Sequence, residues 1–135
     1  MIKPIALALL LAAATAAADE APDRWNLADL YPSVKAWHDD AGKLRAELKT
    51  LAACRGHLGE SATRLRGCVE RSAAASKRLA RLEVYAEELL AEDTGVPESL
   101  ELSQQARVLS TELSQTTAFM RPELLRLGAA RIEQF

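Results

Sequence analysis

Apolar residues along the chain recur at alternating steps of three and four, the spacing that places side chains on one face of an α-helix. The first such stripe follows Ser33, a residue type that caps helix N-termini, and it ends before Gly56 and Gly59. Its members are Val34, Trp37, Ala41, Leu44, Leu48 and Leu51. The pattern predicts an amphipathic helix over about 33–54.

Two further stripes of the same kind follow. The second begins at Ser61, reaches residue 92, and consists of Leu65, Cys68/Val69, Ser72, Ala75/Ser76, Leu79, Leu82, Ala86 and Leu89. The third begins at Pro97, which a first helical turn tolerates, and consists of Leu102, Ala106, Leu109, Leu113, Thr116 and Met120. Helices at about 33–54, 61–92 and 97–120 predict an all-α fold with three long antiparallel helices.

Both ends of this pattern carry apolar residues outside the stripes. Residues 19–32 are expected to form an extended lead-in, and Arg121-Pro122 is expected to stop the third helix before a short C-terminal helical segment. The residues outside the stripes are Trp25, Leu124, Leu125, Leu127 and Phe135. Because exposed apolar patches of several hundred Å² mark missing partners, we expect these side chains to face another part of a larger assembly.

The first eighteen residues have the layout of a secretory signal peptide. Lys3 supplies a positive charge, an uncharged apolar run of about thirteen residues follows, and small residues precede a predicted cleavage site between Ala18 and Asp19. A transmembrane anchor would need about 20 apolar residues, so no stable membrane anchor is expected. The predicted organisation is a signal peptide at 1–18, the lead-in at 19–32 and a helical domain at 33–135, exported to the periplasm or secreted.

Composition narrows the function classes. The chain has 135 residues, of which 4% are aromatic, which argues against an all-β sandwich. Seventeen basic and nineteen acidic residues give a net charge of −2, so a nucleic-acid partner is not expected. The charges are unevenly spread, because residues 41–82 hold most of the bases and residues 83–101 hold seven acids and no base. An antiparallel arrangement could set these two blocks against each other.

Export changes how the two cysteines are interpreted. Cys54 and Cys68 are the only pair, and in an oxidising compartment they are expected to form a disulfide. The alternative is two separate buried thiols. Geometry is an obstacle to the bond, since Cys68 two turns along its helix would be offset from Cys54 by about 10 Å, more than a disulfide spans.

The sequence contains no recognisable catalytic or metal-binding motif. His38 and His57 are 19 positions apart, and zinc needs three or four ligands held together. No His-Glu-x-x-His pair, nucleophile elbow or phosphate-binding loop occurs. We therefore assign no catalytic residue, no metal ligand and no cofactor to this chain.

Three short segments, in order, resemble the oligoendopeptidase F family of thimet-like zinc metallopeptidases. The first is Trp25-Asn26-Leu27-Ala28-Asp29-Leu30-Tyr31-Pro32, the second is Arg81-Leu82-Glu83-Val84-Tyr85-Ala86 with Glu92-Asp93-Thr94, and the third is Phe119-Met120-Arg121-Pro122-Glu123-Leu124-Leu125. The signature residues are Trp25, Leu30, Tyr31, Tyr85 and Pro122. They are expected to be structural.

The resemblance covers the N-terminal helical part of the family, which forms one wall of a substrate channel. It implies a fragment of an enzyme that cleaves short peptides. The predicted signal peptide adds export, and it and the two cysteines depart from the cytoplasmic members of the family. Zinc would be held only by a catalytic domain absent from this chain, and that domain would be the main partner. The alternative that the residues leave open is a free-standing exported helical interaction module.

Overall fold

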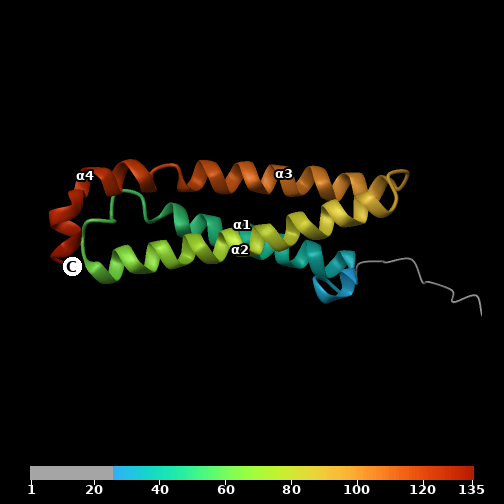
Figure 1. The fold of residues 1–135 in the computed structure, drawn as a ribbon, viewed down its shortest axis with the longest axis horizontal. Helices are drawn as coiled ribbons and strands as arrows, with labels where there is room; N and C mark the ends of the chain where they lie inside the picture. The colour runs from blue at the N-terminus through green and yellow to red at the C-terminus, as the bar shows by residue number, and fades with distance from the viewer. Residues whose placement is uncertain (1–25) are drawn as a thin grey trace, which may run out of the picture.

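The structure is a computed structural model that describes residues 26–135 and places them in five helical elements. A 3-10 turn, η1 (Leu27–Asp29), precedes α1 (Val34–Ala52), α2 (Ala62–Glu92), α3 (Pro97–Thr117) and α4 (Met120–Glu133). Figure 1 shows α1, α2 and α3 running antiparallel along the long axis, with α4 at the end where α1 connects to α2. The predicted all-α fold with three long helices is confirmed, and residues 26–135 contain no strand.

The helix starts follow from local capping. The hydroxyl oxygen of Ser33 accepts a hydrogen bond from the amide of Ala36 at 3.2 Å, and that of Ser61 accepts one from Arg64 at 3.1 Å. Each bond satisfies one of the amides that the first turn of a helix leaves without a partner. Pro97 opens α3, where its missing N–H costs no intrahelical bond.

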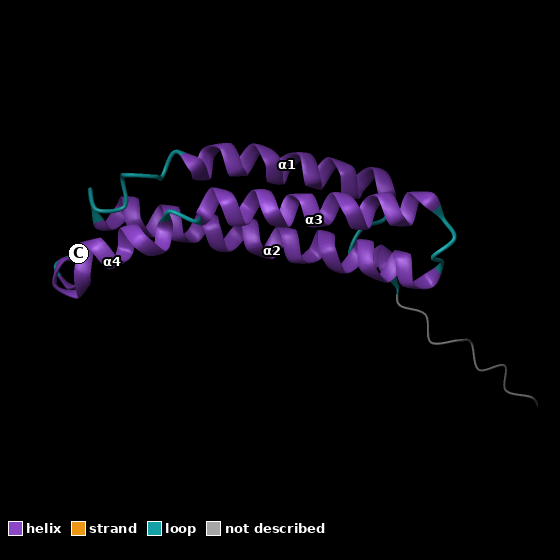
Figure 2. Ribbon diagram, turned by 90° about the horizontal axis from the view of Figure 1, so that it is seen from above, coloured by secondary structure: helices purple, strands orange, loops and turns teal. Residues whose placement is uncertain are grey.

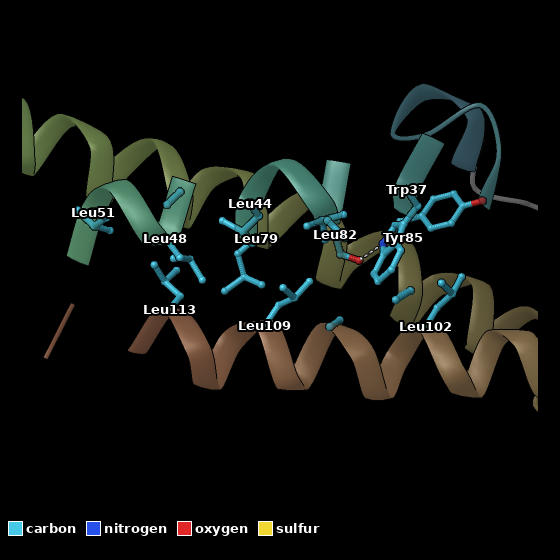
Figure 3. Packing of buried hydrophobic residues seen from close by; sticks show 14 of the residues in the cluster. Trp37, Leu44, Leu48, Leu51, Leu79, Leu82, Tyr85, Leu102, Leu109 and Leu113 are labelled. Atoms are coloured by element: carbon cyan, nitrogen blue, oxygen red, sulfur yellow. Dashed lines mark hydrogen bonds between the residues drawn. The ribbon is translucent and has the colours of Figure 1, made fainter. Parts of the chain in front are cut away.

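The core lies between the three long helices, which pack side by side in Figure 2. Most stripe positions are buried, and those near the ends of the helices are partly buried; the fully covered large side chains include Trp37, Leu44, Leu51, Leu82, Leu102 and Leu109. Figure 3 shows leucines from all three helices meeting along one seam. Val69 and Ser76 instead face solvent, because the smaller Cys68 and Ala75 occupy the buried positions of α2.

One buried hydrogen bond ties α1 to α2 within this core. The indole Nε1–H of Trp37 donates to the backbone carbonyl of Leu82 at 2.9 Å, drawn as a dashed line in Figure 3. A buried indole needs such a partner, since an unpaired donor in a core costs about 1–3 kcal/mol. The bond therefore fixes both the depth of Trp37 and the position of α1 along α2.

The break between α3 and α4 falls earlier than the sequence pattern suggested. α3 ends at Thr117, and Pro122 lies in the first turn of α4 instead of ending α3. A proline ring clashes with the carbonyl four residues before it and offers it no N–H, which here is the carbonyl of Ala118. The interruption therefore appears at 118–119, and Phe119 is buried there.

The two ends of the described chain are more ordered than an extended lead-in and a short tail. Residues 27–29 form a 3-10 turn, across which the Asn26 side-chain Nδ2 donates a hydrogen bond to the Asp29 carboxylate. α4 continues to Glu133 across a kink at Gly128, whose φ of 72° lies in the region that favours glycine. Two of the residues expected to face a missing partner, Leu124 and Leu127, pack partly against the core.

Of the remaining predictions for the termini, some concern described residues and the others do not. Leu125 and Phe135 are exposed, as the sequence pattern suggested. Trp25 and the predicted cleavage site at Ala18 and Asp19 lie outside the described residues. Within residues 26–135, none of the helices combines the length and the apolar character that crossing a bilayer demands.

Candidate functional site

The structure brings two of the family-signature residues into direct contact. Tyr31, from the lead-in, and Tyr85, from α2, pack edge to face with ring centroids 5.4 Å apart. Both rings are buried, and Tyr31 lies 54 positions before Tyr85 in the sequence. Aromatic pairs of this geometry contribute about 0.5–1.5 kcal/mol beyond the area they bury. The two motifs therefore meet at one site, where the lead-in docks on the helical hairpin.

Arg81 contacts the same docking site of the lead-in from the solvent-exposed side. Its Nη2 donates to the backbone carbonyl of Leu30 at 2.7 Å, and its guanidinium lies 5.1 Å from the centroid of the Tyr31 ring. Leu30 itself is partly buried against the core. One arginine thus binds both the backbone and the aromatic side chain of the lead-in, which a lysine could not do with the same geometry.

Below Tyr31, a half-buried ionic network crosses from α1 to α2. The Tyr31 hydroxyl donates to Asp40 Oδ2 at 2.7 Å, and Asp40 also accepts from Arg78 Nη1. The other terminal nitrogen of Arg78 lies 3.0 Å from Glu47. Among residues 26–135, Arg78 Nε and Glu47 Oε2 are buried without a hydrogen-bond partner. The network places one cation between two carboxylates, of which Asp40 is the better covered, with 15% of its side chain exposed against 41% for Glu47.

The surroundings of each tyrosine also raise the pKa of its hydroxyl. Burial, together with the hydrogen bond to Asp40 and its negative charge, raises the pKa of the Tyr31 hydroxyl well above its usual range. Burial also raises the pKa of Tyr85, with smaller contributions from Glu98 and Glu92. Both hydroxyls therefore stay protonated at physiological pH. The Tyr31 hydroxyl uses its proton in the hydrogen bond to Asp40.

A disulfide joins Cys54 to Cys68 at the opposite end of the bundle. The Cα atoms are 6.0 Å apart, not offset by about 10 Å as the helix positions suggested. α1 ends at Ala52, and successive turns carry the loop outward from Cys54 before α2 begins at Ala62. The first two turns of α2 then run back toward Cys54, so Cys54 and Cys68 lie at the same height along the bundle axis. Both are buried, with 1% of their surface exposed.

We refer to residues 53–61, which follow α1 and include Cys54, as the disulfide loop. This loop contacts the start of α4. The amide of Gly56 donates to Glu123 Oε1 at 2.6 Å, and the Arg55 guanidinium lies 5.4 Å from the Phe119 ring centroid. Pro122, the signature residue of the third motif, is exposed in the same first turn of α4. Pro122 is therefore far from the Tyr31–Tyr85 contact, and the structure does not bring all signature residues together.

The two histidines lie apart on the surface. His38 is exposed on α1, and His57 lies in the disulfide loop, where its Nδ1 is 2.5 Å from Glu60 Oε1. That hydrogen bond lowers the pKa of the Glu60 carboxyl. Across residues 26–135, no three histidine, cysteine, aspartate or glutamate side chains are placed to hold a metal ion. The donors present in this part of the chain do not fit a zinc site.

The basic and acidic blocks do not face each other as suggested. In the described part of the chain, no ion pair joins a base of residues 41–82 to an acid of residues 83–101. The acidic block folds upon itself at the turn between α2 and α3, so both sides of that turn are acidic. Instead, Arg78 on α2 pairs with Asp40 and Glu47 on α1 and links the two helices.

Sequence reasoning missed the charged half of the docking site. Asp40 and Glu47 are seven residues apart, so they lie on one face of α1, next to the apolar stripe. Arg78 and Arg81 are similarly placed on one side of α2, one turn apart. Two carboxylates two turns apart at the edge of a buried stripe are the signal that could have pointed to a bridging cation.

The comparisons with known proteins point to a class of peptide-cleaving enzymes. The chain is related to oligopeptidases over most of its own length, which supports the resemblance to the oligoendopeptidase F family. It is 30% identical over 116 residues to oligopeptidase PepF of Bacillus subtilis, covering 86% of this chain and 17% of that protein. It is 28% identical over 112 residues to group B oligopeptidase PepB of Streptococcus agalactiae, covering 83% of this chain and 19% of that protein.

The two relatives are much longer than the matched region. The chain spans less than a fifth of the length of either curated relative. No protein-family profile and no solved structure matches the chain. The similarity therefore relates this chain to a part of an oligopeptidase.

Proposed function

We propose that this chain is the N-terminal helical part of an exported, oligoendopeptidase F-like zinc metallopeptidase that cleaves short peptides. It forms one wall of the substrate channel and leaves catalysis to a separate catalytic domain. The observation that carries the proposal is the similarity to two oligopeptidases over more than four-fifths of this chain. The same matched region is less than a fifth of each relative, which supports a role as one part of a larger enzyme.

The fold is suited to such a wall. Three long helices share a closed core, and α2, with 31 residues, is about 46 Å long. The lead-in is fixed to this core by Tyr31, Tyr85 and Arg81, so the backbone entering the domain has a defined position. Zinc and its His-Glu-x-x-His ligands belong to the catalytic domain in this proposal, since the donors of residues 26–135 do not fit a metal site.

An antibody raised against α2 tests the proposal in the source cells. The expected result is an immunoblot band several times heavier than the 14.7 kDa of this sequence, found in the exported fraction. Material captured by the antibody should cleave a quenched fluorescent peptide, and a zinc chelator should abolish cleavage. A second arm sequences the exported protein from its N-terminus, which should begin at Asp19. A start at Met1 would contradict export by signal-peptide cleavage.

The alternative is a free-standing exported helical interaction module, and one observation favours it. Residues 26–135 form a closed core of their own, with Trp37, Leu44 and Leu109 fully covered without another chain. An immunoblot band at the size of this sequence, with no peptidase activity in the captured material, would overturn the oligopeptidase proposal in favour of this module.

A further inference from the structure

The first turn of α4 is held against the bundle by residues of the disulfide loop. Gly56 donates its amide to the Glu123 carboxylate, the one side-chain hydrogen bond within residues 26–135 that joins α4 to another segment. Gly59 is so close to Leu127 that a Cβ at residue 59 would lie 2.5 Å from a methyl carbon of that leucine. The loop and α4 therefore meet through a polar contact and a close apolar contact.

The disulfide fixes the loop at the place where α4 contacts it. Backbone hydrogen bonds within the loop are local turns, such as His57 N–H to Cys54 O at 3.0 Å. What ties these turns to the rest of the bundle is the bond from Cys54 to Cys68 on α2, together with the fully buried side chain of Leu58. Without the covalent bond, the middle of the loop, which Glu123 binds, would be anchored by the buried Leu58, while only its ends stay hydrogen-bonded to α1 and α2.

The opposite side of α4 is apolar and open to solvent. An open hollow there is lined by Met120, Arg121, Leu124, Leu125, Gly128, Ala129 and Ile132. Leu125 is 72% exposed, the largest exposure among the large apolar side chains of residues 26–135. The orientation of this apolar surface relative to the bundle depends on where the first turn of α4 is held.

We propose that oxidation of Cys54 and Cys68 positions α4. When the two thiols give up two electrons and two protons to a disulfide oxidant, such as oxidised glutathione, the S–S bond forms and fixes the disulfide loop. Gly56 and Gly59 then hold α4 through Glu123 and Leu127. When a dithiol reduces the bond, the sulfurs regain two protons and two electrons, the loop moves more freely and α4 loses the contacts that Gly56 and Gly59 provide. The apolar surface of α4 is thus presented in a fixed orientation only after oxidation.

Backbone order parameters from NMR relaxation test this directly, because they report local motion instead of global stability. In the oxidised protein, amides of both α3 and α4 should have order parameters of about 0.85, typical of a rigid backbone. In dithiothreitol, the order parameters of α4 should fall below about 0.6, while those of α3 stay unchanged. The Cys54→Ala/Cys68→Ala variant should match the reduced protein without added reductant.

Glu123→Ala separates the loop contact from the disulfide itself. In oxidised protein it should lower the α4 order parameters, whereas Glu133→Ala, an exposed matched control on the same helix, should leave them unchanged. In reduced protein Glu123→Ala should add no further change, because the contact is already lost. The proposal is overturned if reduction leaves α4 rigid, if α3 loosens to the same extent, or if Glu123→Ala acts equally in both redox states.

Discussion

Removing the disulfide tests how much of the fold's stability depends on one covalent bond. Both cysteines are 1% exposed, so alanine is the suitable replacement, since it leaves no buried hydroxyl without a partner. The bond spans a sequence separation of 14, and closing a loop of this size stabilises a protein by about 3 kcal/mol in the chain-entropy model. The Cys54→Ala/Cys68→Ala variant should therefore lose about 3 kcal/mol of unfolding free energy, a Tm decrease on the order of 10 °C.

Urea denaturation followed by far-UV circular dichroism measures this loss. A second effect is expected in the chain-entropy model, because the cross-link restricts the unfolded chain. The slope of unfolding free energy against urea should rise in the variant, whose unfolded state is more extended. Dithiothreitol should destabilise the wild type to the level of the variant and should not affect the variant. A loss below about 1 kcal/mol, or a full loss with an unchanged slope, would refute the reasoning.

Three further substitutions probe the core and the docking site. Trp37→Phe removes the hydrogen bond to Leu82 and should cost about 1–3 kcal/mol of unfolding free energy in urea denaturation. Leu109→Ala empties a fully buried position and should cost about 3–4 kcal/mol, whereas the adjacent Val108→Ala, at a side chain 52% exposed, should change stability by less than about 0.5 kcal/mol. The pKa of Tyr31 is higher in the folded protein than its value of about 10 in the unfolded chain. The stabilisation that Tyr31 provides is therefore complete below pH 10 and is lost as the pH rises above 10. The stability advantage of wild type over Tyr31→Phe should therefore shrink above pH 10, by at most about 1.4 kcal/mol per pH unit, in denaturation measured at several pH values; an advantage that stays constant to pH 11 would contradict the assignment. The 135-residue chain itself should not hydrolyse a quenched fluorescent peptide with added zinc, and chelator-sensitive cleavage would prove this wrong.

The helices could be predicted from the sequence because their apolar residues are regularly spaced. Steps of three and four from Val34 to Leu51 leave one face for the core, and the structure buries that face as expected. Ser33 and Ser61 could be recognised as caps because the amide three residues later is always available to a serine in that position. These signals depend only on neighbours within a few residues.

Contacts between distant segments could not be predicted in the same way. The pairing of Tyr31 with Tyr85 depends on the register of α1 against α2, and a resemblance of motifs carries no register. Helix positions alone overestimate the distance between Cys54 and Cys68, because the loop after Ala52 runs outward before α2 begins. The sequence pattern suggests that Pro122 ends α3 at its own position, whereas its ring acts on the carbonyl four residues earlier.

The placement of Arg78 between Asp40 and Glu47 has an evolutionary consequence. A variant that loses the arginine leaves two half-buried carboxylates on the same face of α1 without a cation, and a variant that loses one carboxylate leaves the cation half paired. Single substitutions at these positions are therefore selected against more strongly than a combined replacement by apolar residues. Descendants of this sequence should change the three positions as a group, and a homologue with a leucine in place of the arginine should have uncharged residues at both partner positions.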